Sequence, residues 1–239
     1  MKWTEEYRIC SHDTDMTGCV RAAAYMRFMQ ETAYRHMAAA GPSAETLREA
    51  GRAFLLCRIT LSVYKSLRQG DIIEDVTWAN ESAGVNFGRS FNVYHNNMLA
   101  AEAQSVWMLY DFINGHILRA QEVQLNYGTD EVLELELPRR LSLPDGVEPT
   151  LEGVRTAEYA DIDENRHVNN TVYADLLCGR TPEIASGDAH ISSLYINFCN
   201  QWRCDEEIRI YRAQSDGIYY FKTLRPDGRV NIEAKIIAE

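Results

Sequence analysis

A short polar motif occurs twice in this chain of 239 residues, and this repeat constrains the fold more than any other feature. The first copy, DTDMTGCVRAAAY, spans residues 13–25, and the second, DIDENRHVNNTVY, spans residues 161–173. Self-similarity at a fixed separation is typical of a duplicated structural unit. Four identical residues keep one separation of 148 positions: Asp13 and Asp161, Asp15 and Asp163, Val20 and Val168, Tyr25 and Tyr173.

A second pair of segments follows the two motifs. ITLSVYKSLRQGDII (59–73) aligns with LYINFCNQWRCDEEI (194–208) at a separation of 135 positions. Both segments begin with the apolar–polar alternation of a half-buried strand. Farther on, residues 93–107 and 224–237 each read as strand, turn and strand, with HNN and PDG as the turns. We therefore expect each copy to run from a short strand through a polar loop and a helix into several antiparallel strands.

The helix expected in the first copy has apolar residues at near-helical spacing, which predicts a face packed on a sheet. Methionine also suits adaptable apolar surfaces, so Met26, Met29 and Met37 could instead line a pocket for an acyl chain. In the second copy a shorter helix shows the same pattern. The residues of the first stripe are Ala22, Met26, Met29, Ala33 and Met37.

The segment between the copies is charged and carries three prolines, which predicts a linker. The expected organisation is an N-terminal domain over 1–127, a linker over 128–150 and a C-terminal domain over 151–239. A helix packed on an antiparallel sheet in each domain corresponds to an α+β layered fold.

Composition excludes several classes of protein. The net charge of −11 argues against non-specific nucleic-acid binding, which needs a basic surface. The longest apolar runs are too short to span a bilayer, and residues 1–10 lack the pattern of a signal or transit peptide. The six cysteines form no CxxC pair, so we expect reduced, buried thiols and no metal or organic cofactor. These features predict a cytoplasmic protein.

The sequence resembles the bacterial branch of the acyl–acyl-carrier-protein (acyl-ACP) thioesterases, which are related to plant acyl-ACP thioesterases. The strongest motif is Asp163-x-Asn165-x-His167-Val-Asn-Asn, and RICSHDTDMTG (8–18) resembles the opening strand and loop of the family. The resemblance implies a tandem hotdog fold, in which each repeat is a long helix wrapped by an antiparallel β-sheet. It also implies hydrolysis of fatty acyl-ACP in fatty acid biosynthesis, with catalytic residues in the C-terminal domain and an acyl pocket shaped by the N-terminal domain.

The residues of the second motif suit this chemistry. The Asp163 carboxylate can activate water or attack the thioester directly. The Asn165 amide can stabilise the oxyanion, and His167 can orient a group or protonate the leaving thiolate. Turn and cap chemistry would also explain such a loop. The first copy, however, has Thr17 and Cys19 at the positions of Asn165 and His167, which favours one active and one degenerate site.

One departure from the family concerns the strand expected over residues 196–207. The resemblance implies a functional Glu-Cys pair there in plant members, of which bacterial members usually keep the Glu, and these positions align with Gln201 and Trp202. An amide does not titrate, so Gln201 could help hold a water molecule but could not act as a base. On an alternating strand Cys204 would share a face with Trp202, whereas Cys199 would not. We interpret both cysteines as structural.

The resemblance makes acyl carrier protein the expected partner, and an acidic partner requires basic residues on this acidic chain. Alternatives are an acyl-CoA thioesterase, a hotdog hydratase or dehydratase, and a non-catalytic acyl-binding protein. The hydratase signature spaces its Asp and His one residue farther apart than Asp163 and His167. Two linked domains can pair within one chain, so a monomer or a homodimer is expected. The candidate docking residues are Arg180, Arg203, Arg209 and Arg212.

Overall fold

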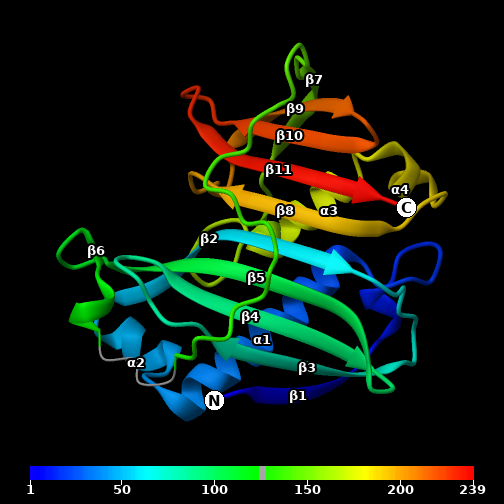
Figure 1. The fold of residues 1–239 in the computed structure, drawn as a ribbon. Helices are drawn as coiled ribbons and strands as arrows, with labels where there is room; N and C mark the ends of the chain where they lie inside the picture. The colour runs from blue at the N-terminus through cyan, green and yellow to red at the C-terminus, as the bar shows by residue number, and fades with distance from the viewer. Residues whose placement is uncertain (124–127) are drawn as a thin grey trace. The chain divides into compact units, whose positions relative to one another are not determined.

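The chain folds into two compact units in a computed structural model that describes residues 1–123 and 128–239 (Figure 1). Unit 1 comprises residues 1–20 and 24–137, and unit 2 comprises residues 21–23 and 138–239. The division after Leu137 falls inside the predicted linker, while the predicted domain end at residue 127 lies outside the described residues. Within the described ranges, no helix is both long and apolar enough to cross a membrane.

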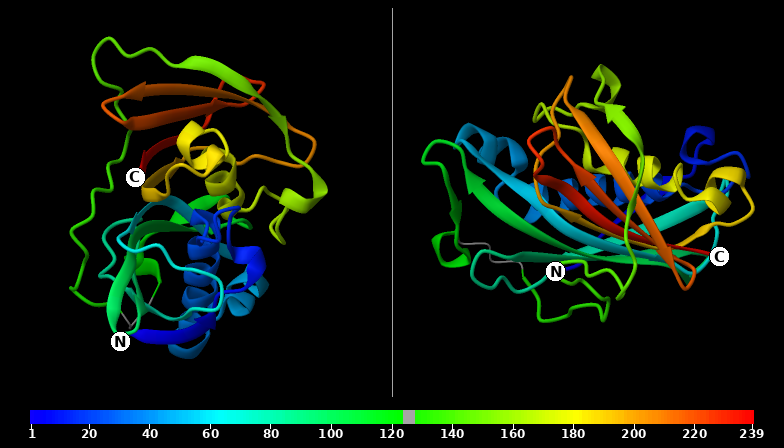
Figure 2. Two further views of the ribbon diagram at one scale, coloured as in Figure 1. Left: turned by 90° about the vertical axis from the view of Figure 1, so that its right-hand side faces the viewer. Right: turned by 90° about the horizontal axis from the view of Figure 1, so that it is seen from above.

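Unit 1 is an antiparallel sheet packed against one long helix. The strand order is β1-β3-β4-β5-β2, and β6 pairs with β5. The strands curve around α1, as Figure 2 shows. Its elements are β1 (Trp3–Arg8), η1 (Ser11–Asp13), α1 (Ala22–Ala40), α2 (Ala44–Glu49), β2 (Arg52–Val63), β3 (Ile72–Ala79), β4 (Phe87–His95), β5 (Met98–Asp111), β6 (His116–Leu118) and η2 (Ala120–Glu122).

Unit 2 repeats this topology, with the strand order β7-β9-β10-β11-β8. Each unit therefore has the helix-on-sheet arrangement predicted from the repeat, and the α+β tandem hotdog fold is confirmed. The helices differ, because α1 has 19 residues and α3 has only 9. The elements are β7 (Thr150–Thr156), η3 (Tyr159–Asp161), α3 (Asn170–Cys178), α4 (Pro182–Ser186), β8 (Ile191–Phe198), β9 (Glu207–Ser215), β10 (Ile218–Leu224) and β11 (Val230–Ala238).

The apolar stripe of α1 packs in the core of unit 1, as its spacing predicts. Met26 and Met29 are 4% and 1% exposed. Met37 is half-buried and packs against a cluster in which Leu47 of α2 and Phe87 of β4 are buried. Unbranched methionine side chains fill irregular space of this kind well. A role of these methionines in binding an acyl chain stays a prediction.

The linker is held by side chains of the two sheets, although it forms no strand of its own over residues 130–149. In unit 1, Trp78 Nε1 and Asn80 Nδ2 both donate to the carbonyl oxygen of Glu131, at 2.7 and 2.6 Å. In unit 2, the Tyr195 hydroxyl donates to the carbonyl oxygen of Pro138 at 2.7 Å. These bonds satisfy linker carbonyl groups that a strand partner would otherwise pair.

Ionisable side chains are buried between α1 and the sheet of unit 1. Asp75 on β3 is 0% exposed, and neither carboxylate oxygen has a hydrogen-bond partner among the described residues. Burial raises the pKa of Asp75 to about 7, although the nearby Thr32 hydroxyl opposes this shift. His36 of α1 is also fully buried, and burial together with Arg89 lowers its pKa to about 4. At neutral pH His36 is therefore uncharged, and it accepts a hydrogen bond from Arg89 at 3.0 Å.

Candidate active site

The two polar loops have the same backbone structure. Asp15 and Asp163 each donate a backbone hydrogen bond to the carbonyl of the residue four positions later, at 2.8 and 2.9 Å. Their Oδ1 atoms each accept the backbone N–H two positions later, at 2.8 Å in both loops. The turn then passes through a left-handed residue, Gly18 at φ 77° and Arg166 at φ 62°. Both aspartates thus fold their own loops, as Asx-turn residues commonly do.

The earlier aspartate of each motif is also a turn residue. Oδ2 of Asp13 and Asp161 accepts the backbone N–H three positions earlier, at 2.9 and 3.0 Å. In unit 2, Oδ1 of Asp161 also accepts a charge-assisted hydrogen bond of 2.6 Å from Arg155. The aspartates that match between the copies therefore have a shared structural role, so a catalytic role must rest on what differs between the loops.

The two loops differ in the groups they present around the second aspartate. In unit 1 the Thr17 hydroxyl donates to Asp15 Oδ1 at 2.6 Å, and Cys19 is only 3% exposed. In unit 2 the corresponding Asn165 is exposed and His167 is half-buried. The carboxylate itself is half-buried in both loops. The second loop alone therefore combines a carboxylate, an exposed amide and a partly accessible imidazole.

The imidazole of His167 lies in a mixed electrostatic environment. Burial is the largest effect and lowers its pKa. Asp163 and Glu206 raise the pKa, and Arg203 lowers it, with the net result below the ordinary value of 6.5. His167 is therefore mostly neutral at pH 7, and a neutral imidazole can both donate and accept a hydrogen bond.

This electrostatic balance predicts the pH dependence of activity. If turnover requires neutral His167, the acidic limb of kcat/KM lies below pH 6.5, because the lowered pKa keeps the ring neutral to lower pH. Replacing Arg203 by Gln removes a positive charge that disfavours imidazolium, so the limb should move to higher pH. Arg209→Gln is the matched control, since the charges that shift the pKa of His167 are those of Asp163, Arg203 and Glu206. A limb that stays in place in Arg203→Gln would show that His167 does not govern it.

The helix that follows the loop, α3, begins directly after an asparagine cap. Asn169 is the N-cap of α3, and its side-chain oxygen accepts both the backbone N–H and the hydroxyl of Thr171 at 2.9 Å. Asparagine is among the best N-cap residues because its oxygen satisfies a free N–H of the first turn. The cap fixes where the loop ends and the helix starts.

The structure corrects the prediction for Gln201 and Trp202. They lie in the connection between β8, which ends at Phe198, and β9, which begins at Glu207. The alternation expected for a strand therefore does not apply there. Gln201 is exposed, whereas Trp202 is 0% exposed and packs edge-on against Tyr173 at a centroid distance of 5.7 Å.

Trp202 anchors the polar loop to this connection. Its carbonyl accepts the backbone N–H of Val168 at 2.8 Å, and its Nε1 donates to the carbonyl of Glu206 at 2.8 Å. His167 and Arg203 form an antiparallel bridge beside it. The buried Trp202 thus has a packing role, and the exposed Gln201 lies next to the loop through this pairing.

Sequence reasoning missed a buried polar network behind the loop. Asn231 Nδ2 donates to the carbonyl of Asn200 at 2.5 Å and to the Tyr173 hydroxyl at 3.0 Å. Its Oδ1 accepts from the Thr223 hydroxyl at 2.9 Å. The repeat marks Tyr173 as the match of Tyr25, but its partner Asn231 lies on β11, 58 residues farther along the chain. The network fixes the chain immediately before Gln201.

The cysteines and arginines also differ from expectation. Cys10, Cys199 and Cys204 are exposed rather than buried, because they lie in loops. The four candidate docking arginines do not form one patch. Arg212 donates to the carbonyl of Arg180 at 2.7 Å, while Arg209 lies on the opposite face of β9 because neighbouring strand residues alternate. Only the exposed Arg203 adjoins the candidate site.

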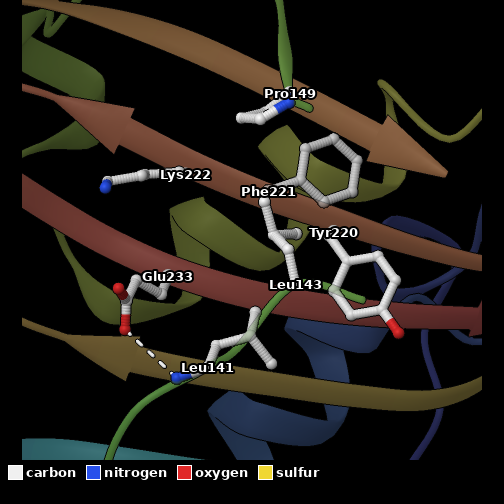
Figure 3. Close-up of a pocket in the computed structure, with 7 residues that line it drawn as sticks. All are labelled: Leu141, Leu143, Pro149, Tyr220, Phe221, Lys222 and Glu233. Atoms are coloured by element: carbon white, nitrogen blue, oxygen red, sulfur yellow. Dashed lines mark hydrogen bonds between the residues drawn. The ribbon is translucent and has the colours of Figure 1, made fainter. Parts of the chain in front are cut away.

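A cavity of about 230 Å³ lies elsewhere in unit 2 (Figure 3). It is formed where the linker crosses β10 and β11, and Lys222 and Glu233 are its charged lining residues. Glu233 Oε2 also accepts the backbone N–H of Leu141 at 3.4 Å. None of the predicted site residues lines this cavity, so it is not a pocket of the candidate site. The other lining residues are Leu141, Leu143, Pro149, Tyr220 and Phe221.

Two units of the same topology, with the helix of each packed on its sheet, define a tandem hotdog protein. The whole chain superimposes on a crystal structure of an acyl-ACP thioesterase from Bacteroides thetaiotaomicron with a TM-score of 0.89 and 19% identity, covering 98% of that chain. It also superimposes on a 12:0-ACP thioesterase from Umbellularia californica with a TM-score of 0.77 and 19% identity, covering 97% of that chain.

Sequence comparison gives the family. Residues 1–125 match the acyl-ACP thioesterase N-terminal domain, and residues 151–237 match its C-terminal domain. The chain therefore belongs to the acyl-ACP thioesterase family. It is 20% identical over 229 residues to a chloroplastic palmitoyl-acyl carrier protein thioesterase of Gossypium hirsutum, covering 90% of this chain and 55% of that protein. The chain spans about half the length of such relatives.

Proposed function

We propose that this chain hydrolyses the thioester of fatty acyl-ACP and releases free fatty acid and ACP, as a step of fatty acid biosynthesis in the cytoplasm. Family membership supports the reaction class. The assignment to particular residues rests on a comparison of the two polar loops. They share the same backbone hydrogen bonds, but only the second presents Asn165 and His167 beside its aspartate.

In the proposed reaction, Asp163 is the general base. Its carboxylate takes a proton from water as the water oxygen bonds to the thioester carbon. The C–S bond then breaks, and the thiolate of the carrier takes up the proton that Asp163 received, which restores the Asp163 carboxylate. The backbone N–H of Asn165 holds Asp163 Oδ1 at 2.8 Å, which restricts the carboxylate to one orientation. A fixed orientation favours proton transfer because the reacting groups need no further ordering.

The two neighbouring side chains assist this step. The exposed amide of Asn165 donates a hydrogen bond to the carbonyl oxygen, where negative charge develops. Neutral His167 donates its ring N–H toward the sulfur as the thiolate leaves, which its lowered pKa permits at pH 7. Gln201 has a supporting role in holding the water. It cannot replace the carboxylate of the family because its amide does not titrate.

The carrier is tested by measuring thiol release from matched acyl-ACP and acyl-CoA thioesters of several chain lengths. The proposal predicts a higher kcat/KM for acyl-ACP at the best chain length. Arg203→Glu should raise KM for acyl-ACP and leave KM for acyl-CoA nearly unchanged, because Arg203 is exposed beside the loop. Equal preference for the two carriers, with equal effects of Arg203→Glu, would instead assign the chain an acyl-CoA thioesterase activity.

A further inference from the structure

A cluster of metal-ligating side chains lies in unit 1, at the loop between β1 and α1. Cys10 Sγ, a ring nitrogen of His12 and a carboxylate oxygen of Asp13 all lie within 4.8 Å of one another. The three residues lie within one short segment, with Cys10 as the N-cap of η1 and His12 and Asp13 inside it. We propose that they form a binding site for a thiophilic divalent cation of the Zn²⁺ class.

The loop backbone places the carboxylate for this role. Asp13 Oδ2 accepts the backbone N–H of Cys10 at 2.9 Å, so the carboxylate is held by one oxygen. The other oxygen, Oδ1, lies 3.7 Å from His12 Nε2. Zn²⁺ bonds of about 2.0 to 2.3 Å in tetrahedral geometry place ligand atoms roughly 3.3 to 3.8 Å apart. The carboxylate and imidazole already have this separation.

The Cys10 thiol and the His12 imidazole can both adjust toward a shared metal position at little cost. Cys10 is exposed and the side chain of His12 is 77% exposed, so both can change rotamer without disturbing the core. The Cys10 thiol donates only a weak 3.5 Å hydrogen bond to the carbonyl of Arg8. Thiolate, imidazole and carboxylate together are a donor set that suits Zn²⁺, and water can take the fourth position.

The duplicated loop of unit 2 serves as an internal comparison. Its backbone is the same, but the positions of Cys10 and His12 are occupied by Glu158 and Ala160. The aspartate there has its Oδ1 engaged by an arginine at 2.6 Å. In unit 1 the nearest guanidinium, that of Arg27, lies 3.8 Å from Asp13 Oδ1, beyond hydrogen-bond distance. Only the first loop therefore combines the three ligands. Its Asp13 is only 5% exposed, and its Oδ1 faces His12 at 3.7 Å and Arg27 at 3.8 Å, both beyond hydrogen-bond distance.

The test is Zn²⁺ binding to the whole chain, measured by competition with a chromophoric chelator in a non-thiol reductant. We expect one Zn²⁺ per chain, with affinity reduced at least about tenfold in Cys10→Ser and in His12→Ala. Arg27→Gln should tighten binding because it removes a competing positive charge. Asp13→Asn is avoided, since Asp13 also holds the loop backbone.

Two controls separate a metal site from general thiol binding. Cys204→Ser removes an exposed thiol from unit 2 and should leave Zn²⁺ affinity unchanged. With Co²⁺ as the probe, thiolate-to-metal absorption should be present in the wild type and absent in Cys10→Ser. The proposal fails if Cys10→Ser and His12→Ala bind Zn²⁺ as the wild type does, or if the wild type shows no stoichiometric binding. Neither result bears on the hydrolysis proposed for unit 2.

Discussion

Replacing Asp163 by Asn should lower kcat for acyl-ACP hydrolysis roughly 100- to 10,000-fold, the usual contribution of a general base. Asparagine keeps an oxygen that can accept the Asn165 N–H at 2.8 Å, so the turn should survive. The loss should therefore appear in thiol release and not in the thermal unfolding temperature. A kcat within about threefold of the wild type would exclude Asp163 as the base.

The matched control is Asp15→Asn in the other copy. Asp15 makes the same turn, with the same 2.8 Å bond to the backbone N–H two positions later. If Asp163 were only a turn residue, the two substitutions would have similar, small effects on activity. The proposal predicts that Asp15→Asn retains near wild-type kcat, so the duplication separates catalysis from loop structure within one molecule.

Replacing Asp75 by Asn should stabilise the protein above neutral pH by up to about 4 kcal/mol. The pKa of Asp75 is raised from 3.8 in the unfolded chain to about 7 in the folded one. Between these values the folded state binds more protons, so the contribution of this group to stability falls as pH rises from about 4 to 7. Asparagine has no such charge to bury, and its advantage should be small at pH 4 and largest above pH 7.

Denaturant unfolding at pH 5 and pH 8 tests this prediction. The measured quantity is the difference in free energy of unfolding between Asp75→Asn and the wild type at each pH. Tryptophan fluorescence mainly reports unit 1, which holds Trp3, Trp78 and Trp107. Exposed Asp130→Asn is the control and should show no pH-dependent difference. An Asp75→Asn difference that is the same at both pH values would mean that Asp75 is ionised in the folded protein.

Local patterns were sufficient to predict most of the fold. The HNN turn is a two-residue hairpin loop with Asn96 and Asn97 at φ 50° and 60°, a conformation asparagine tolerates. The buried faces of Met26 and Met29 follow from helical spacing. The strand expected through Gln201 was wrong, because the alternation there continues past the residue where β8 ends. Trp202 pairs with the polar loop, and periodicity carries no information about such a partner.

The candidate site could be predicted only in part. The repeat located the loop, and the mismatch at Asn165 and His167 identified what differs between its copies. Sequence could not show that Asp163 holds a backbone N–H, or that Asn231, on β11, bonds to Tyr173. Nor could it show the burial that lowers the pKa of His167. These features arise from contacts between segments that are far apart along the chain.

The most direct test of the central claim is to incubate the purified wild-type chain with an excess of acyl-ACP and quantify both products over time. The account predicts repeated turnover, with one free thiol and one free fatty acid formed per acyl-ACP consumed, and turnover at least about 100-fold slower by Asp163→Asn. Saturable binding of acyl-ACP without thiol release, by a wild-type chain shown to be folded, would contradict hydrolysis and identify an acyl-binding protein.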